Sequence, residues 1–129
     1  MPFKLLLFIT RKPTVSPAEF KDHWDNKHVA LLKSIAGDKF PLTHTRNCIS
    51  RTEDNGTWPA NVIVGTQEDF SYDGIAELVF ENEAAFKTFF AIISESEAAA
   101  RIAADEEVFA VREKFKAIVL GETSVTSRD

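Results

Sequence analysis

The sequence predicts an α+β fold: a ferredoxin-like, four-stranded antiparallel sheet with helices on one face. Three observations predict it. Residues 3–9 form an apolar strand, Ser16 begins an amphipathic helix, and the elements follow the order strand, helix, strand, strand, helix, helix, strand. The 129 residues suit one domain, and no repeat or linker divides them. We therefore expect a single domain over 1–129, with 123–129 as a loose tail.

The first strand is apolar on both of its alternating faces, which predicts a strand that is covered on both sides. The next element has a clear start. Ser16 is a typical N-cap, Pro17 suits the first helical position, and Glu19 completes a capping box. A helix is therefore predicted from Ser16.

This helix carries one apolar stripe that runs to about Ala36, where Gly37 is a fitting terminator. The stripe consists of Phe20, Trp24, Leu31, Leu32 and Ile35. Asn26 is a candidate position for a kink. A second strand is expected over 42–52, with His44, Arg46 and Cys48 on one of its faces.

The second half of the chain begins with a long loop over 53–69, followed by a third strand over 75–80. A helix follows from Asn82 to about Ile93, and an alanine-rich helix continues to about Glu106, capped by Ser94 or Ser96. From Val108 the pattern turns to strand, most clearly over 115–119.

Composition excludes several classes of protein. The net charge of −5 disfavours nucleic acid as a partner. The single cysteine, Cys48, suits a reducing compartment, so we expect a cytoplasmic protein. The apolar N-terminus is too short to span a membrane and has no cleavage site after it. Metal motifs, glycine-rich phosphate loops and a GxSxG elbow are absent, so no metal and no cofactor are expected.

The first strand also predicts a homodimer. Helices cover one face of the sheet, and the other face needs a partner because the strand has no polar residue at its centre. Two sheets packed face to face would close into a barrel. Burying roughly 500 Å² of apolar area per chain contributes on the order of 10 kcal/mol before association costs. The 11 phenylalanines further suggest a pocket for a small hydrophobic or aromatic substrate.

Two groups of residues resemble the EthD domain family. The first comprises Arg11-Lys12-Pro13, Ser16-Pro17-x-Glu19-Phe20, Trp24, His28 and Ala30-Leu31, and the second is the Asp-Gly strand from Asp73 to Phe80. The resemblance implies a dimeric α+β barrel and a cofactor-free enzyme. It implies in particular the cyclases, decarboxylases and dehydratases of polyketide pathways, such as small fungal members, or cofactor-independent monooxygenases of anthrone-like substrates. Val29 and the Trp58-Pro59 insertion depart from the family pattern and leave the substrate open.

His28 is the first candidate catalytic residue. It lies on the apolar stripe that should face the sheet, and the family position agrees. Imidazole titrates near neutral pH, which suits proton transfer in enolisation, dehydration or decarboxylation. The alternative is a core histidine that is hydrogen-bonded to the backbone. His44 is the second candidate, facing inward or not according to a strand register that the sequence leaves open. Arg46 would share its face and bind a substrate carboxylate or phenolate, or else form a surface ion pair.

Glu77 is the third catalytic candidate, because it lies in the middle of an apolar strand. The alternative places it at the dimer seam. Tyr72 is a candidate donor to an oxyanion, and Asp73 is a candidate substrate ligand or a turn residue. Trp24 is expected to be a pocket wall or a core anchor. His23 should lie at the border of the stripe, in contact with solvent.

These expectations favour a cofactor-free lyase or cyclase that acts on a polyketide-like intermediate in secondary metabolism by histidine acid/base catalysis. The alternatives are a cofactor-independent monooxygenase of anthrone-type substrates and a non-catalytic, small-molecule-binding dimer.

Overall fold

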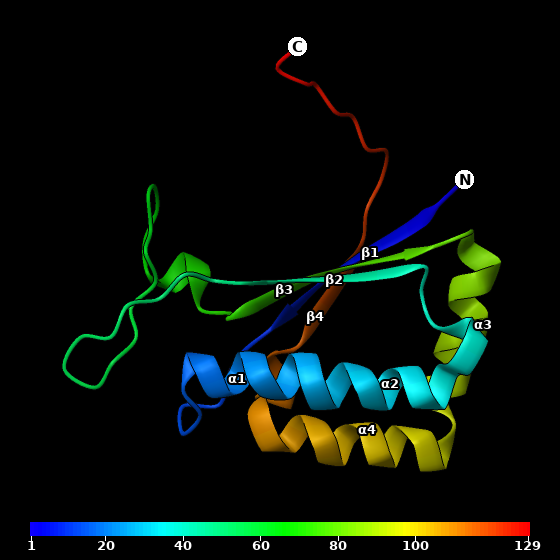
Figure 1. The fold of residues 1–129 in the computed structure, drawn as a ribbon, viewed down its shortest axis with the longest axis horizontal. Coiled ribbons are helices and arrows are strands. Elements are labelled where there is room, and N and C mark those ends of the chain that lie inside the picture. The colour runs from blue at the N-terminus through cyan, green and yellow to red at the C-terminus, as the bar shows by residue number, and fades with distance from the viewer.

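A computed structural model describes all residues, 1–129, and has a four-stranded antiparallel sheet with helices on one face (Figure 1). The strands lie in the order β2-β3-β1-β4. They comprise β1 (Phe3–Ile9), β2 (Thr43–Cys48), β3 (Gly74–Phe80) and β4 (Lys116–Val119). The predicted ferredoxin-like fold is confirmed.

The helical layer contains α1 (Pro17–His23), α2 (Val29–Ala36), α3 (Glu83–Ser94) and α4 (Ser96–Phe109). The predicted start of α1 is confirmed. The hydroxyl of Ser16 accepts a hydrogen bond from the Glu19 N–H at 3.1 Å, and the Glu19 carboxylate accepts one from the Ser16 N–H at 2.9 Å. At α4 the prediction was wrong, because the carboxylate of Glu95 and not a serine caps the helix.

A π-helical turn, Trp24–His28, joins α1 to α2 at the position where a kink was predicted. Its hydrogen bond runs from the Val29 N–H to the Trp24 carbonyl, five residues back. A π-turn makes residues five apart neighbours on one side of the helix, whereas an α-helix makes residues three or four apart neighbours. The turn therefore changes which side chains of this helix point the same way.

Strand alternation divides the side chains of the sheet between its two faces. On β3, Gly74, Ala76, Leu78 and Phe80 are buried under the helices, and the residues between them point to the other side. The cross-strand register carries this division through the sheet. The side without helices, which we call the open face, carries the apolar residues Leu6, Phe8, Ile75, Val79 and Ile118.

Trp24 packs where β3 begins, and this contact explains Gly74. The Trp24 ring is fully buried, and a Cβ added at Gly74 would lie 2.5 Å from its Cζ3 atom. Any larger residue at 74 would therefore overlap the indole. The Asp-Gly pair opens a strand here and does not serve only as a turn.

The C-terminal region differs from the prediction after Val108, where we expected strand. The α4 helix continues to Phe109, a 3-10 turn covers Arg112–Lys114, and β4 alone pairs with β1. Beyond β4 the tail has no helix or strand and extends away from the sheet (Figure 1). None of the helices has both the length and the apolar character needed to cross a membrane.

The predicted long loop between β2 and β3 also extends away from the helices (Figure 1), and Arg51 fixes its base. The Arg51 guanidinium donates to the carbonyls of Trp58 at 2.9 Å, Phe70 at 2.9 Å and Tyr72 at 3.0 Å. Its Nε lies 2.7 Å from the Asp73 carboxylate. One buried cation therefore joins three points of the loop to the start of β3.

Candidate functional site

The imidazole of His28 is 4% exposed and lies against α4. Its Nδ1 is 2.7 Å from Oδ2 of Asp105, and the other carboxylate oxygen of Asp105 is 3.0 Å from Nε2 of His23. The π-turn explains the pair, because His23 and His28 are five residues apart and so point the same way. His23 lies at the border of the stripe, as predicted, but its ring is not surrounded by solvent, because only 14% of the side chain is exposed and Nε2 pairs with Asp105.

The contact with Asp105 sets the tautomer of His28. A carboxylate only accepts hydrogen bonds, so Nδ1 carries the proton and Nε2 of the neutral ring has a free lone pair. Nε2 lies 3.9 Å from Oε2 of Glu106, which is too far for a hydrogen bond. The other oxygen of Glu106 pairs with Nε of Arg112 at 3.2 Å. His28 thus has the arrangement of an oriented general base with carboxylates on both sides.

The space at His28 is small. A hollow of about 10 Å³, barely room for one water, lies beside the ring. Its other lining residues are Ile9, Glu106, Phe109, Ala110, Val111, Arg112 and Phe115.

A larger apolar pocket of about 280 Å³ lies between α3 and strands β1 and β4. It is lined only by hydrophobic residues: Leu5, Leu7, Leu78, Phe86, Phe89, Phe90, Ile93, Phe115, Ala117, Ile118 and Val119.

His44 and Arg46 lie on the helix-facing side of the sheet, because they pair with Leu78 and Ala76 of β3. The register that the sequence left open is therefore settled. Nη1 of Arg46 is 3.1 Å from Nδ1 of His44, and its Nε is 2.7 Å from the carboxylate of Asp25. Burial and the charge of Arg46 lower the pKa of His44 from 6.5 to about 4. At neutral pH, His44 is a neutral ring whose Nδ1 accepts from Arg46 and whose Nε2–H is a donor.

Glu77 and Tyr72 lie on the other side of the sheet. Glu77 pairs with Leu6 and Thr45, which puts its side chain on the open face. The ring of Tyr72 packs edge-on against Phe8, 4.9 Å between centroids, on the same face. The sheet therefore separates both candidates from His28.

Asp73 and Trp24 are buried, and their contacts hold the fold together. The Asp73 carboxylate is buried and accepts from the backbone N–H of Arg11 at 2.8 Å and from its Nε at 3.2 Å. Its pairing with Arg51 at 2.7 Å completes a buried cluster of two cations and one anion. Trp24 is a core residue packed against Gly74. No group of three or more His, Cys, Asp or Glu side chains is arranged to hold a metal ion.

Sequence reasoning missed Asp105 and Glu106. They follow an alanine-rich stretch and read as part of a solvated helix face, yet both side chains are only about one-fifth exposed. The available signal was the spacing of five between two histidines, which is meaningful only if the helix contains a π-turn.

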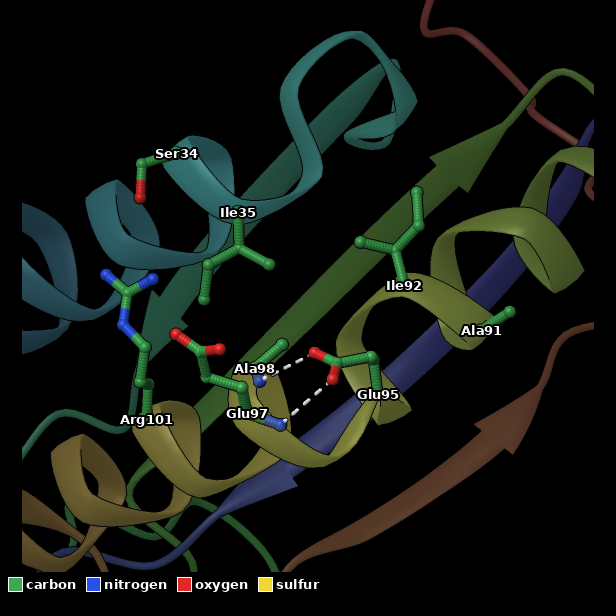
Figure 2. A pocket seen from close by; sticks show the side chains of 8 residues that line it. All are labelled: Ser34, Ile35, Ala91, Ile92, Glu95, Glu97, Ala98 and Arg101. Atoms are coloured by element: carbon green, nitrogen blue, oxygen red, sulfur yellow. Dashed lines mark hydrogen bonds between the residues drawn. The ribbon is translucent and has the colours of Figure 1, made fainter.

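A larger hollow lies elsewhere, between α2, α3 and the start of α4 (Figure 2). It measures about 600 Å³ and has no histidine in its wall. The carboxylate of Glu95 already accepts from the backbone N–H groups of Glu97 at 3.3 Å and Ala98 at 3.2 Å (Figure 2). The helix end is therefore satisfied by the chain itself, and the environment of His28 is the better candidate site.

The profile of the EthD domain matches residues 12–113. The chain belongs to the EthD domain family. The matched range of this EthD protein includes His28, Asp105 and Glu106 and ends before Phe115.

Solved structures support the fold of this EthD protein. An Arabidopsis thaliana protein is 19% identical, with a TM-score of 0.58, over 97% of this chain and 99% of its own. SnoaB of Streptomyces nogalater, a cofactor-independent oxygenase, is 14% identical, with a TM-score of 0.53, over 96% and 95%. A dimeric ferredoxin-like protein of Thermobifida fusca is 13% identical, with a TM-score of 0.52, over 95% and 92%. No curated protein matches the sequence.

Proposed function

We propose that this EthD protein is a cofactor-free lyase or cyclase in which His28 moves a proton on a polyketide-like substrate. The supporting observation is the buried imidazole whose Nδ1 is bound to Asp105 at 2.7 Å and whose Nε2 is free beside a hollow. The substrate class and the loss of CO2 or water come from the family resemblance.

The proton transfer follows from this geometry. Nε2 takes the proton from the carbon beside a carbonyl, and the electrons of the C–H bond form an enolate. Asp105 and the Glu106 carboxylate stabilise the imidazolium that results. In dehydration, Nε2 returns the proton to a leaving hydroxyl group, which departs as water. In decarboxylation, Nε2 takes the proton of the carboxylic acid, the C–C bond breaks to release CO2 and leave an enolate, and Nε2 then returns the proton to the carbon that lost CO2.

Two groups from β2 support the enolate in this proposal. His44 is neutral at pH 7 and offers its Nε2–H, and Arg46 adds a positive charge. Both lie on the side of the sheet that faces the helices, and His28 lies in this helical layer. Neutral His44 therefore acts as a donor in this scheme and not as a second base.

The test compares wild type with His28→Ala on aromatic β-keto acids, with mass analysis for the loss of CO2 or water. We expect His28→Ala to fold and to lose turnover by roughly 10²–10⁴-fold, the contribution of a positioned acid or base. Arg101→Ala, in the larger hollow of Figure 2, is the matched control and should turn over substrate normally. An unchanged rate in His28→Ala rules out the assigned role.

A cofactor-independent oxygenase is the second candidate, and the fold likeness to SnoaB favours it. The first step would be the same, with His28 deprotonating an electron-rich phenol. The carbanion would then react with O2, one oxygen atom entering the product and the other leaving as water. Turnover that stops under anaerobic conditions supports this candidate, and turnover that continues supports the lyase. A non-catalytic binding dimer would keep its ligand affinity when all three histidines are replaced.

We also propose that the open face is covered by a second copy of the chain. The Thermobifida fusca structure is described as dimeric, and the open face carries five apolar residues. Ile75→Lys, on this face, should sediment as a monomer at concentrations where wild type is a dimer. Ile63→Lys is the control, because Ile63 is 97% exposed in the long loop. Wild type that sediments as a monomer contradicts the proposal.

A further inference from the structure

The hollow at His28 is too small for the substrate of the proposed reaction. A reacting carbon must come within about 3–3.5 Å of Nε2, and the body of the molecule must lie somewhere nearby. The hollow has about 10 Å³, and the apolar pocket has about 280 Å³. A small organic molecule fits only the second space.

The two spaces are successive along β1. Ile9 lines the hollow, and Leu7 and Leu5 line the apolar pocket, all three on the helix-facing side of the strand. Alternate residues of a strand are about 7 Å apart, so the spaces lie within the length of one aromatic ring system.

Phe115 is the one residue that lines both spaces. It lies between the 3-10 turn and β4, where its backbone N–H donates to the Arg112 carbonyl at 3.1 Å. Phe115 is 44% exposed, so solvent is available to a ring that rotates outward. The residue thus separates the two spaces and is not locked into the core.

We propose that Phe115 is a specificity-determining gate between the apolar pocket and His28. The ligand of the apolar pocket has a flat, uncharged aromatic body, which suits the wholly hydrophobic walls. The polar end of this ligand reaches His28 when the ring of Phe115 moves. The charged side chains of Glu106 and Arg112 lie only at the His28 end, which fixes this orientation. The chemistry at His28 rests on the proposed function, whereas the separation of the two spaces does not.

The test uses 1-naphthol, a flat aromatic probe, and NMR of the folded protein. Wild type should bind naphthol with shifts of the Ile93 and Val119 methyl signals and none of the His28 ring signals. Phe115→Ala should add a shift of the His28 ring signals. Phe90→Ala is the matched control, because Phe90 lines the apolar pocket and not the hollow. Removal of the Phe90 ring can change the affinity for naphthol, but it should leave the His28 ring signals unshifted.

Three results would overturn the gate: no naphthol binding to wild type, a shift of His28 already in wild type, or an unshifted His28 in Phe115→Ala. Phe115→Leu takes the place of Phe115→Ala if circular dichroism shows that the alanine variant has lost structure. These measurements report binding and do not require the protein to convert a substrate. If His28→Ala keeps full activity while naphthol reaches His28 only in the Phe115 variants, the proposed chemistry fails and the gate stands.

Discussion

Replacing Asp105 by asparagine tests the orientation of His28 with almost no change of shape. The carboxylate accepts from His28 at 2.7 Å and from His23 at 3.0 Å. An amide has one oxygen and one NH₂ group, so it can accept from only one of the two rings and must offer a donor to the other. If the NH₂ faces His28, its Nδ1 becomes the acceptor and the proton moves to Nε2.

The expected losses of stability and of rate follow from the hydrogen bond that the substitution removes. A hydrogen bond to a charged group contributes about 1.5–3 kcal/mol, so the folded protein should lose stability by an amount of that order. The rate should fall further, because a ring protonated at Nε2 has no lone pair at the position that meets the substrate. Loss of a positioned base lowers turnover by roughly 10²–10⁴-fold, which corresponds to about 3–5 kcal/mol in the barrier.

The assay is ¹⁵N NMR of the histidine rings together with turnover of an aromatic β-keto acid. In wild type, His28 should be protonated at Nδ1. In Asp105→Asn, either His28 or His23 should be protonated at its other ring nitrogen, and the reduced rate should accompany the change at His28. Glu107→Gln is the control, since it makes the same change on an exposed part of α4. The tautomer assignment is refuted if both His23 and His28 keep their wild-type protonation in Asp105→Asn, or if the tautomer of His28 changes and turnover does not.

Three further predictions concern stability. Burial and Arg46 lower the pKa of His44 to about 4, so the unfolded chain takes up a proton first as the pH falls. The free energy of unfolding should therefore be unaffected by His44 above pH ~6.5 and should fall by about 3 kcal/mol between pH ~6.5 and pH ~4. His44→Gln should remove this part of the pH dependence in urea titrations. Gly74→Ala should lower the free energy of unfolding by roughly 1–3 kcal/mol through overlap with the buried indole, and Gly121→Ala should change it by less than about 0.5 kcal/mol, because nothing lies within 4 Å of an added Cβ there. Arg51→Met should speed amide exchange across 58–72 relative to the helices; unchanged exchange would mean that the loop is held by other contacts.

The parts of the fold that the sequence predicted well are those that local rules determine. The capping box from Ser16 to Glu19 is confirmed atom by atom, because both of its partners lie within four residues. The bounds of β1 agree with its apolar run, and β3 begins one residue before its predicted start. The β2 strand, predicted over 42–52, is the shorter Thr43–Cys48, because the chain turns there into the loop that Arg51 holds.

The partner of His28 could not be predicted in the same way. Asp105 is 77 residues away in the sequence, and no local rule connects them. His23 lies at the border of the stripe, as predicted, but its pairing with Asp105 was not foreseen, because an α-helical period does not align residues five apart as the π-turn does.

Which candidates lie on which face depends on a single contact. Alternation groups Glu77 apart from Gly74, Ala76 and Leu78, but it leaves open which group faces the helices. The indole of Trp24 settles this, because it needs the space above Gly74 and so fixes that face of β3 as the inner one. Cross-strand pairing then puts His44 opposite Leu78, beneath the helices, and leaves Glu77 on the open face. The signal was therefore a glycine at the first position of the strand, facing a tryptophan on the helix stripe. This contact separates the proton-transfer candidates from the residues of the proposed dimer interface.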